Sequence, residues 1–180
     1  MKHEIDEWAL FNQVATAKKF FGTKCSKYAG AVCVELIKNS LQQCGIATSS
    51  RDVFIDGVPI ELDLLLPRYE AKAQYGLLYK PKDVLAVLEV KNSGSFGQST
   101  IDRIKSNFEI ICRSNPQIVC IYVTLTEGKT FRYRVTVDNI GADAYTLFWH
   151  VGAETNRRYE PTGDWAKLID RLEMIAQAAG

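Results

Sequence analysis

The chain lacks several features that mark common protein classes. Its formal net charge is only +1 over 180 residues, so the whole molecule has no field that attracts nucleic acid, and any basic binding face has to be local. No apolar run approaches the roughly 20 residues that a membrane helix needs. No glycine-rich phosphate loop, Ser-His-Asp set or G-x-G-x-x-G motif is present. These absences argue against a membrane protein, a P-loop enzyme, a triad hydrolase and a dinucleotide-binding enzyme.

Cysteine use points to a reducing environment. There are five cysteines, an odd number, and no two have the C-x-x-C spacing of a zinc site, so neither a disulfide framework nor a zinc knuckle is indicated. Cys33 and Cys120 lie in apolar runs and are predicted to be small core residues. Acidic residues at Glu4, Asp6 and Glu7 do not fit a secretory signal. We expect a reduced, soluble, cytoplasmic protein.

Hydrophobic periodicity predicts a mixed order of helices and strands. Helices are predicted over residues 4–20, 26–44, 98–113 and 165–176, and strands over 52–55, 60–66, 84–91, 118–123, 131–137 and 145–151. The order strand, helix, strand from Val84 to Leu125 predicts a βαβ unit with parallel strands. With 47% apolar residues, no repeat and no linker, we expect one α/β domain over residues 1–180, with a central mixed sheet flanked by helices.

Two of the predicted strands carry charges that a buried strand does not normally tolerate. Asp63 lies in the strand over 60–66, and Glu89 and Lys91 lie in the strand over 84–91. Side chains alternate between the two faces of a strand, so Glu89 and Lys91 point to the same side, and Asp63 points away from its apolar neighbours. If the two strands are neighbours, the three charged groups converge at one end of the sheet.

Such a group of residues suits phosphodiester chemistry. Two carboxylates at strand ends offer the hard oxygen ligands that Mg²⁺ and Mn²⁺ prefer. A lysine on the same face is placed to orient or help to deprotonate a water, or to offset negative charge on a phosphate. The pattern therefore predicts a metal site with a lysine beside it.

The same residues resemble the PD-(D/E)XK nucleases, which include restriction endonucleases and archaeal Holliday junction resolvases. The resemblance rests on Asp63 in GVPIELDLLL and on the Glu-Val-Lys run that ends at Lys91 in VLAVLEVKNSG. It covers residues 26–125 and implies a restriction endonuclease-like core of a helix, three antiparallel-like strands, a second helix and a parallel strand. Residues 1–25 add a helix to this core, and residues 126–180 add strands and a closing helix.

The resemblance implies a metal-dependent nuclease. Asp63 and Glu89 would bind Mg²⁺ or Mn²⁺ with the help of the Val90 carbonyl, and Lys91 would act on the water or the phosphate. Glu35, in AGAVCVELIKNSLQQCG, matches a helix glutamate that often assists the metal site in the family. The substrate implied is a nucleic acid, with DNA favoured over RNA, and a homodimer is one assembly that the resemblance allows.

Two further polar residues are candidates for the same site. Glu61 shares the strand face of Asp63, although an exposed strand position is the more common explanation. Gln98 opens the helix after the motif loop, where some family members have a site residue, although polar residues are usual at helix starts. For Glu35, a solvated surface glutamate is the competing interpretation.

Other interpretations stay open from the sequence. The same fold would also serve as a module that holds nucleic acid or a partner protein without cutting it, and the charged trio would also fit a salt-bridge network in a structural domain. Stacking on bases and core packing both fit three tyrosines between the motif strands, Tyr69, Tyr75 and Tyr79. Contacts to phosphates and a solvated surface both fit six basic residues, Lys80, Lys82, Arg103, Lys105, Arg132 and Arg134.

Overall fold

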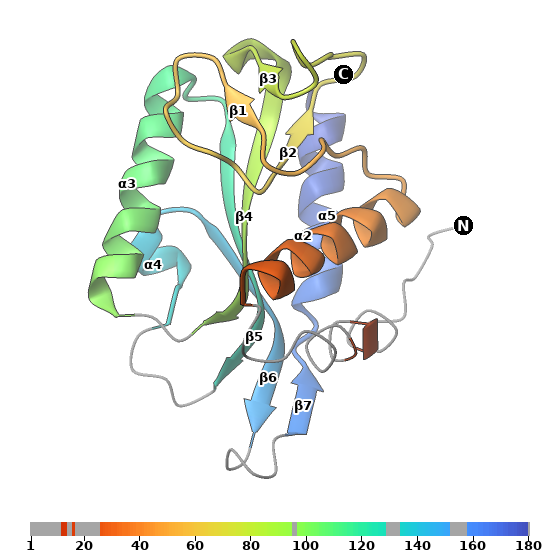
Figure 1. Ribbon diagram of the computed structural model, residues 1–180, viewed down its shortest axis with the longest axis vertical. Coiled ribbons are helices and arrows are strands. Elements are labelled where there is room, and N and C mark those ends of the chain that lie inside the picture. The colour runs from red at the N-terminus through yellow and green to blue at the C-terminus, as the bar shows by residue number, and fades with distance from the viewer. Residues whose placement is uncertain are drawn as a thin grey trace.

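The computed structural model describes residues 12–13, 16, 26–94, 97–128, 134–151 and 158–179. Figure 1 shows a long twisted sheet with helices packed along it. The helices are α2 (Ser26–Gln43), α3 (Gln98–Ser114), α4 (Val137–Ile140) and α5 (Asp164–Gln177), and the 3-10 helix η2 spans Pro81–Asp83. The strands are β1 (Phe54–Ile55), β2 (Leu64–Pro67), β3 (Leu78–Tyr79), β4 (Val84–Gly94), β5 (Val119–Gly128), β6 (Asp143–Val151) and β7 (Arg158–Pro161).

The main sheet is mixed, as predicted. It has five strands in the order β2-β4-β5-β6-β7. The three central strands, β4, β5 and β6, run parallel, and the two edge strands, β2 and β7, are antiparallel to their neighbours. The predicted βαβ unit is confirmed, because α3 connects β4 to β5 and the two strands pair in parallel from Ala86–Val119 to Gly94–Glu127.

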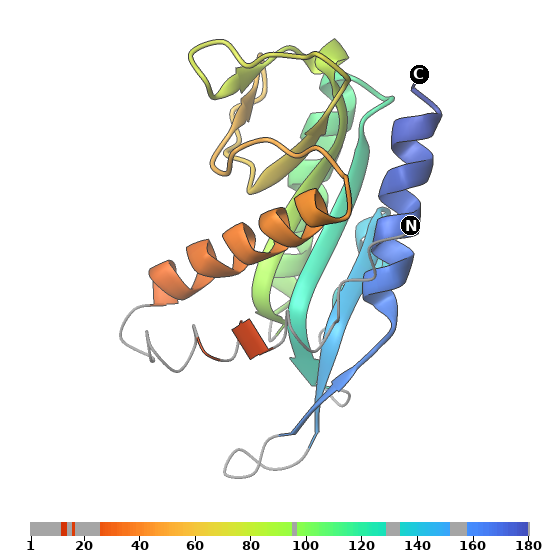
Figure 2. The same ribbon diagram turned by 90° about the vertical axis from the view of Figure 1, so that its right-hand side faces the viewer.

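The sheet is covered on both faces. One apolar cluster joins α2 and α5 to one face of the sheet, with Ile37, Leu41 and Leu168 fully buried. A second cluster joins α3 and α4 to the other face and includes Ile111 and Tyr122. In Figures 1 and 2, α2 crosses the sheet obliquely while α5 runs along it. Burial on both faces explains why the β5 sequence is apolar for most of its length.

The predicted helices over 26–44 and 98–113 are confirmed. Helix α2 ends at a left-handed glycine, Gly45 with φ +81°, and the Ile46 N–H donates to the Leu41 carbonyl at 3.0 Å. This bond satisfies a carbonyl of the last helical turn, and only glycine adopts the required backbone without strain. The Asn115 backbone leaves the helical region at the end of α3, directly before a proline. The predicted helix over 4–20 falls mostly outside the described residues.

The prediction of three antiparallel strands before α3 is wrong in part. Strand β1 does not join the main sheet but pairs in parallel with β3 in a separate two-stranded sheet. Only an isolated antiparallel bridge, Val53–Leu62, links the β1 region to the chain leading into β2. Pro59 cannot donate to a ladder, so strand pairing cannot continue through this connection. Of the predicted strand over 60–66, the part from Leu64 onward forms in the main sheet as β2.

The C-terminal third also differs from the prediction. Val137 was expected to end a half-exposed strand, but it opens α4, since Thr136 and Asn139 form a capping box that fixes a helix start. Residues 134–136 of that predicted strand form no strand, and residues 131–133 lie outside the described residues. The predicted strand over 145–151 is confirmed within β6, and the predicted last helix is α5. Strand β7 was not predicted. In the described ranges no helix is long and apolar enough to cross a membrane.

Candidate active site

Asp63, Glu89 and Lys91 meet at one edge of β4. The antiparallel register pairs Leu64 with Leu88, so Asp63, one residue before β2, lies opposite Glu89. The Val90 N–H donates to Asp63 Oδ2 at 2.7 Å. Lys91 Nζ lies 3.5 Å from the same Asp63 oxygen and forms a closer ion pair with Glu89 Oε1. The structure therefore brings together the three charged side chains that the sequence singled out.

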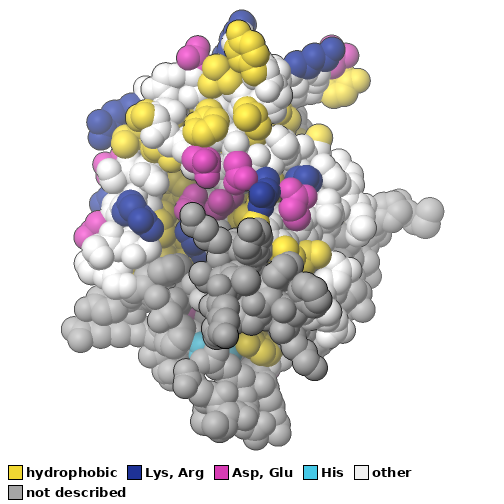
Figure 3. Space-filling view, viewed as in Figure 1, with side chains coloured by type: hydrophobic (Ala, Val, Ile, Leu, Met, Phe, Trp, Pro, Cys, Tyr) yellow, Lys and Arg dark blue, Asp and Glu magenta, His cyan; other side chains and the backbone are white. Residues whose placement is uncertain are grey.

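The three side chains are largely, but not fully, withdrawn from water. Their exposed fractions are 25% for Asp63, 20% for Glu89 and 29% for Lys91. Figure 3 shows acidic and basic side chains gathered near the middle of the face that it presents. This is the region where β2, β4 and α2 meet in Figure 1. A ligand from solvent can therefore reach this edge of the sheet.

Burial sets the electrostatics of Glu89. Its carboxylate lines a narrow pocket together with apolar side chains, among them Leu62 and Phe108. Desolvation raises the pKa of Glu89 above its ordinary value, and the charge of Asp63 adds to that shift, while Lys91 and Arg103 oppose it. Glu89 therefore holds its proton more tightly than a free glutamate does, and a nearby cation is needed to favour its charged form.

The pKa of Lys91 is shifted in the direction that keeps its side chain charged. Burial alone would lower the pKa of Lys91, but the carboxylates of Glu89 and Asp63 outweigh burial, and its pKa lies above the ordinary value. Lys91 is therefore an ammonium ion at neutral pH. In this arrangement it acts as a positive charge and a hydrogen-bond donor, and it is not a base.

The Val90 backbone completes this edge of β4. Its N–H points toward Asp63, and in an extended strand the carbonyl of the same residue points to the same side. The ladder between β2 and β4 ends at the pair Leu64–Leu88, so Val90 lies beyond it. One backbone oxygen and two carboxylates thus face the same region.

The shifted pKa of Glu89 makes a testable prediction about stability. In the unfolded chain a glutamate titrates at about 4.3, and in the folded protein the pKa of Glu89 is higher. The contribution of Glu89 to stability is therefore full below the unfolded pKa and is lost as pH rises through the folded pKa. Because glutamine mimics the protonated form, the Glu89→Gln variant is expected to gain stability relative to the wild type as pH rises through this window.

Urea unfolding of both proteins across the acidic and neutral range measures this difference. Glu109→Gln is a suitable control, because Glu109 is 51% exposed on α3. A difference between Glu89→Gln and wild type that stays constant with pH would contradict the assigned shift.

The remaining predicted site residues lie in other contacts. Glu35 pairs with Lys38 at 2.7 Å and with Arg51 at 3.9 Å. Within the described ranges, no group of three or more acidic, histidine or cysteine side chains is assembled to hold a metal, so Glu35 does not complete a preformed ligand set. Its role as a ligand stays a prediction.

Among the described residues, Glu61 and Gln98 show no hydrogen bond or ion pair to Asp63, Glu89 or Lys91. Glu61 is exposed, as an ordinary strand-end residue would be. Gln98 Nε2 donates to Asp102 Oδ1 at 2.9 Å, a contact within the first turns of α3. Neither residue is brought to Asp63 or Glu89 by a bond that the structure shows.

The sequence interpretation missed a second buried carboxylate. Glu127, near the end of β5, is only 1% exposed, and its Oε2 accepts from Thr146 Oγ1 at 2.9 Å. Arg134 Nε lies 3.4 Å from the same oxygen, and the guanidinium carbon lies 4.3 Å from the centre of the Trp149 ring. Burial raises the pKa of Glu127, while Thr146 and Arg134 oppose the shift. The sequence signal that could have pointed to this residue is a glutamate at the end of the apolar run that forms β5.

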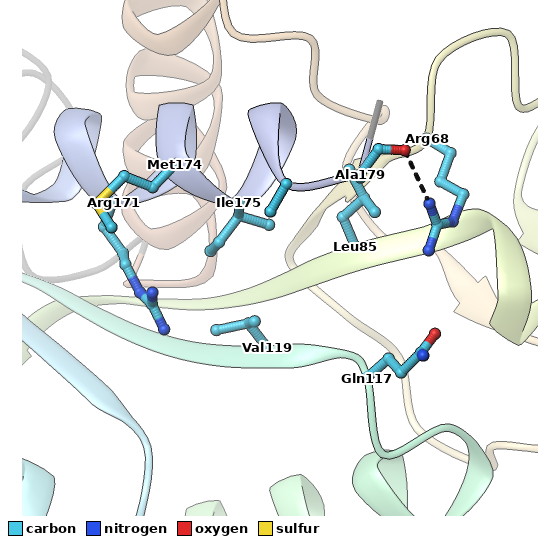
Figure 4. Close-up of a pocket in the computed structure, with 9 residues that line it drawn as sticks. Arg68, Leu85, Gln117, Val119, Arg171, Met174, Ile175 and Ala179 are labelled. Carbon is cyan, nitrogen blue, oxygen red and sulfur yellow. Dashed lines mark hydrogen bonds between the residues drawn. The ribbon is translucent and has the colours of Figure 1, made fainter.

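A pocket of about 490 Å³ lies away from this site, between α5 and the first residues of β4 and β5. Figure 4 shows Arg68 and Arg171 at its two ends, over a floor that includes Leu85 and Val119. Both arginines are engaged: Arg171 Nε donates to Asp143 Oδ2 at 2.7 Å, and Arg68 Nη1 donates to the Ala179 carbonyl at 3.3 Å. They tie α5 to neighbouring segments of the chain, which gives these residues a structural role.

Comparison with known proteins places the fold. The chain matches the solved structure of NucC from P. aeruginosa ATCC27853 in its cAAA-bound form, with a TM-score of 0.61 and 11% sequence identity over 93% of this chain and 88% of that one. NucC is a PD-(D/E)XK-like nuclease. The chain has a restriction endonuclease-like fold.

The other comparisons add less. The native BbvCI A2B2 tetramer matches with a TM-score of 0.47 and 10% identity over 95% of this chain and 86% of that one. No family model matches the chain, and no curated protein does. At such low identity the likeness concerns the fold, so the reaction has to be argued from the residues of the site.

Proposed function

We propose that this protein is a metal-dependent nuclease that hydrolyses phosphodiester bonds, with DNA as the favoured substrate. One observation carries the proposal: oxygens of Asp63 and Glu89 converge on a single cation, the Lys91 ammonium, at an accessible edge of the sheet. The restriction endonuclease-like fold supports it, and so does its likeness to a nuclease.

The donor atoms fit a hard divalent cation. Two carboxylates that already share one positive charge, with a backbone carbonyl on the same side, make an all-oxygen set of the kind Mg²⁺ and Mn²⁺ take. Asp63, Glu89 and Val90 would hold the ion, and Glu35, which pairs with Lys38, is the candidate for a further ligand. When bound, the ion would lower the pKa of a water ligand and stabilise charge on the phosphate.

The chain's own residues supply orientation and charge. The Val90 N–H bond fixes one oxygen of Asp63, which leaves its other oxygen to face a ligand. Burial makes Glu89 a carboxylate that gains from a cation, so ion binding and ionisation favour each other. Lys91 places a positive hydrogen-bond donor beside both carboxylates, where it can hold a water or neutralise a phosphate oxygen.

A non-catalytic binding module is the competing function. It is favoured by one observation: Asp63 and Glu89 already share a cation supplied by the chain itself, the Lys91 ammonium. In that case Lys91, Glu89 and Asp63 would hold the edge of β4 together as a salt-bridge network. Metal affinity separates the two functions.

Titration of Mn²⁺ and Mg²⁺ into the wild type and Glu89→Ala by calorimetry tests the proposal, with cleavage of DNA and RNA followed in parallel. We expect the wild type to take up the ion and to cut, and Glu89→Ala to lose both, because half of the carboxylate set is gone. Glu109→Ala, at an exposed position of α3, is the matched control and should behave as wild type. Absence of metal uptake by the wild type, with nucleic acid present, would favour the salt-bridge network.

A further inference from the structure

Residues 68–83, which connect β2 to β4, place two tyrosines almost entirely in solvent. Tyr69 is 93% exposed and Tyr75 is 96% exposed, whereas Tyr79 is only 8% exposed and belongs to the cluster under α3. Packing therefore accounts for Tyr79. It does not account for the other two, which contribute almost no burial to the fold.

Both exposed tyrosines occupy the second residue of a tight turn. The Ala71 N–H donates to the Arg68 carbonyl at 3.1 Å across Tyr69, and the Leu77 N–H donates to the Gln74 carbonyl at 3.1 Å across Tyr75. The exposures of 93% and 96% show that both side chains project into solvent from these turns. The backbone thus presents two aromatic rings outward from the same connection.

The backbone at Tyr75 is unfavourable for tyrosine. Tyr75 has φ +53° and Gly76 has φ +78°, the positive pair that a type I′ turn requires. The first of these positions is usually asparagine, aspartate or glycine, because other side chains are strained there. Neither local conformation nor packing selects tyrosine at residue 75, so the fold itself gives no reason for an aromatic ring there.

Backbone hydrogen bonds anchor the turn at Tyr75 to β1. The Phe54 N–H donates to the Leu77 carbonyl at 2.9 Å, and the Asp56 N–H donates to the Tyr79 carbonyl at 2.8 Å. These bonds belong to the small β1–β3 sheet, which the Val53–Leu62 bridge joins to the residue next to Asp63. The tyrosine turn is therefore linked, through β1 and this bridge, to the residue next to Asp63.

The charge around the tyrosines is positive. The connection carries four basic residues and two acidic ones, namely Arg68, Lys72, Lys80 and Lys82 against Glu70 and Asp83. The three lysines are exposed. Figure 3 shows hydrophobic and basic side chains side by side at the upper end of the molecule, where Figure 1 places β3. Exposed aromatic rings among lysines match the faces of bases and the phosphates between them.

We propose that Tyr75 and Tyr69 stack on unpaired bases, so that the substrate of this protein is single-stranded nucleic acid or contains a single-stranded segment. Stacking needs an open base face, which a closed duplex offers only at its ends. The exposed lysines hold the backbone of the same strand. This inference rests on the proposed function for the presence of a nucleic acid, and it adds which form of nucleic acid is bound.

Binding without cleavage tests the inference. Fluorescence anisotropy in EDTA compares a labelled single strand with a duplex of the same sequence, for the wild type, Tyr75→Asn and Tyr75→Phe. We expect the wild type to prefer the single strand, Tyr75→Asn to weaken single-strand binding by roughly 5- to 100-fold, and Tyr75→Phe to retain it, since one stacked base supplies that much affinity. Met174→Asn replaces another exposed apolar residue, 60% exposed on α5, and should change nothing.

A thermal melt separates binding from folding. Asparagine suits the positive φ at residue 75, so Tyr75→Asn is expected to melt at the same temperature as the wild type or higher. A lower melting temperature, equal losses for single strand and duplex, or no single-strand binding by the wild type would each overturn the inference. Cleavage assayed separately with metal judges the nuclease: cutting that ignores Tyr75 overturns stacking alone, and Tyr75-dependent binding without cutting overturns the nuclease alone.

Discussion

Replacing Lys91 with alanine is expected to slow single-turnover cleavage by roughly 10²–10³-fold, the usual effect of removing one donor aimed at developing charge. The raised pKa keeps Lys91 protonated at neutral pH, between the oxygens of Glu89 and Asp63. The variant keeps both carboxylates, so metal binding measured by calorimetry should persist or tighten. Loss of the rate without loss of the metal would identify Lys91 as a group that acts on the reacting atoms.

Two further variants serve as controls for Lys91→Ala. Lys105→Ala removes an exposed lysine from α3 and should leave the rate within about twofold of wild type, as expected for a surface change. The double variant Asp63→Ala, Lys91→Ala should be inactive, since it also removes a metal ligand. Full cleavage by the double variant would contradict the assigned site.

Replacing Arg134 with alanine is expected to reduce the free energy of unfolding by about 3 kcal/mol, because it leaves a buried carboxylate without its cation. Glu127 is 1% exposed and Arg134 is 34% exposed. The Glu127 Oε1 atom is already buried without a hydrogen-bond partner in the described ranges, so little is left to compensate for the lost charge. The backbone would stay in place, since the Asn139 side chain donates to the Arg134 carbonyl at 2.6 Å.

Urea unfolding of wild type and Arg134→Ala measures the loss. It should shrink below about pH 4, where Glu127 is protonated in both states and needs no cation. Arg113→Ala breaks an exposed pair with Glu109, in which the side chains are 75% and 51% exposed, and should change stability by less than about 0.5 kcal/mol. A loss that is equally small for Arg134→Ala would show that Glu127 is neutral in the folded protein.

The charged trio was accessible from sequence because its geometry is local. Only Val90 separates Glu89 from Lys91, and a strand with period two has to place both on one face. Asp63 joined them once two neighbouring strands ran antiparallel, a register that the apolar pattern enforces because a one-residue slip would bury the charges. The role of Glu35 was not accessible in this way, because its distance from the trio depends on the angle at which α2 crosses β4.

The roles of the three tyrosines, in contrast, could not be predicted from the sequence. Tyr69, Tyr75 and Tyr79 have the same chemistry and lie in one short connection, and the sequence left stacking and packing equally open. The pairing of β3 with β1 buried Tyr79, and the two tight turns exposed the other rings. That pairing joins residues 24 positions apart, Phe54 with Leu78 and Ile55 with Tyr79, and no periodicity within either segment encodes it.

The sequence by itself determined the order of the main helices and strands, the parallel βαβ unit and the shared face of Glu89 and Lys91. These follow from residues within a few positions of each other, where sterics and apolar periodicity act directly. Only the tertiary structure decided the separate β1–β3 sheet and the burial of Glu127 against Arg134. These depend on which distant segments pack together, and that choice is made by the free energy of the whole fold.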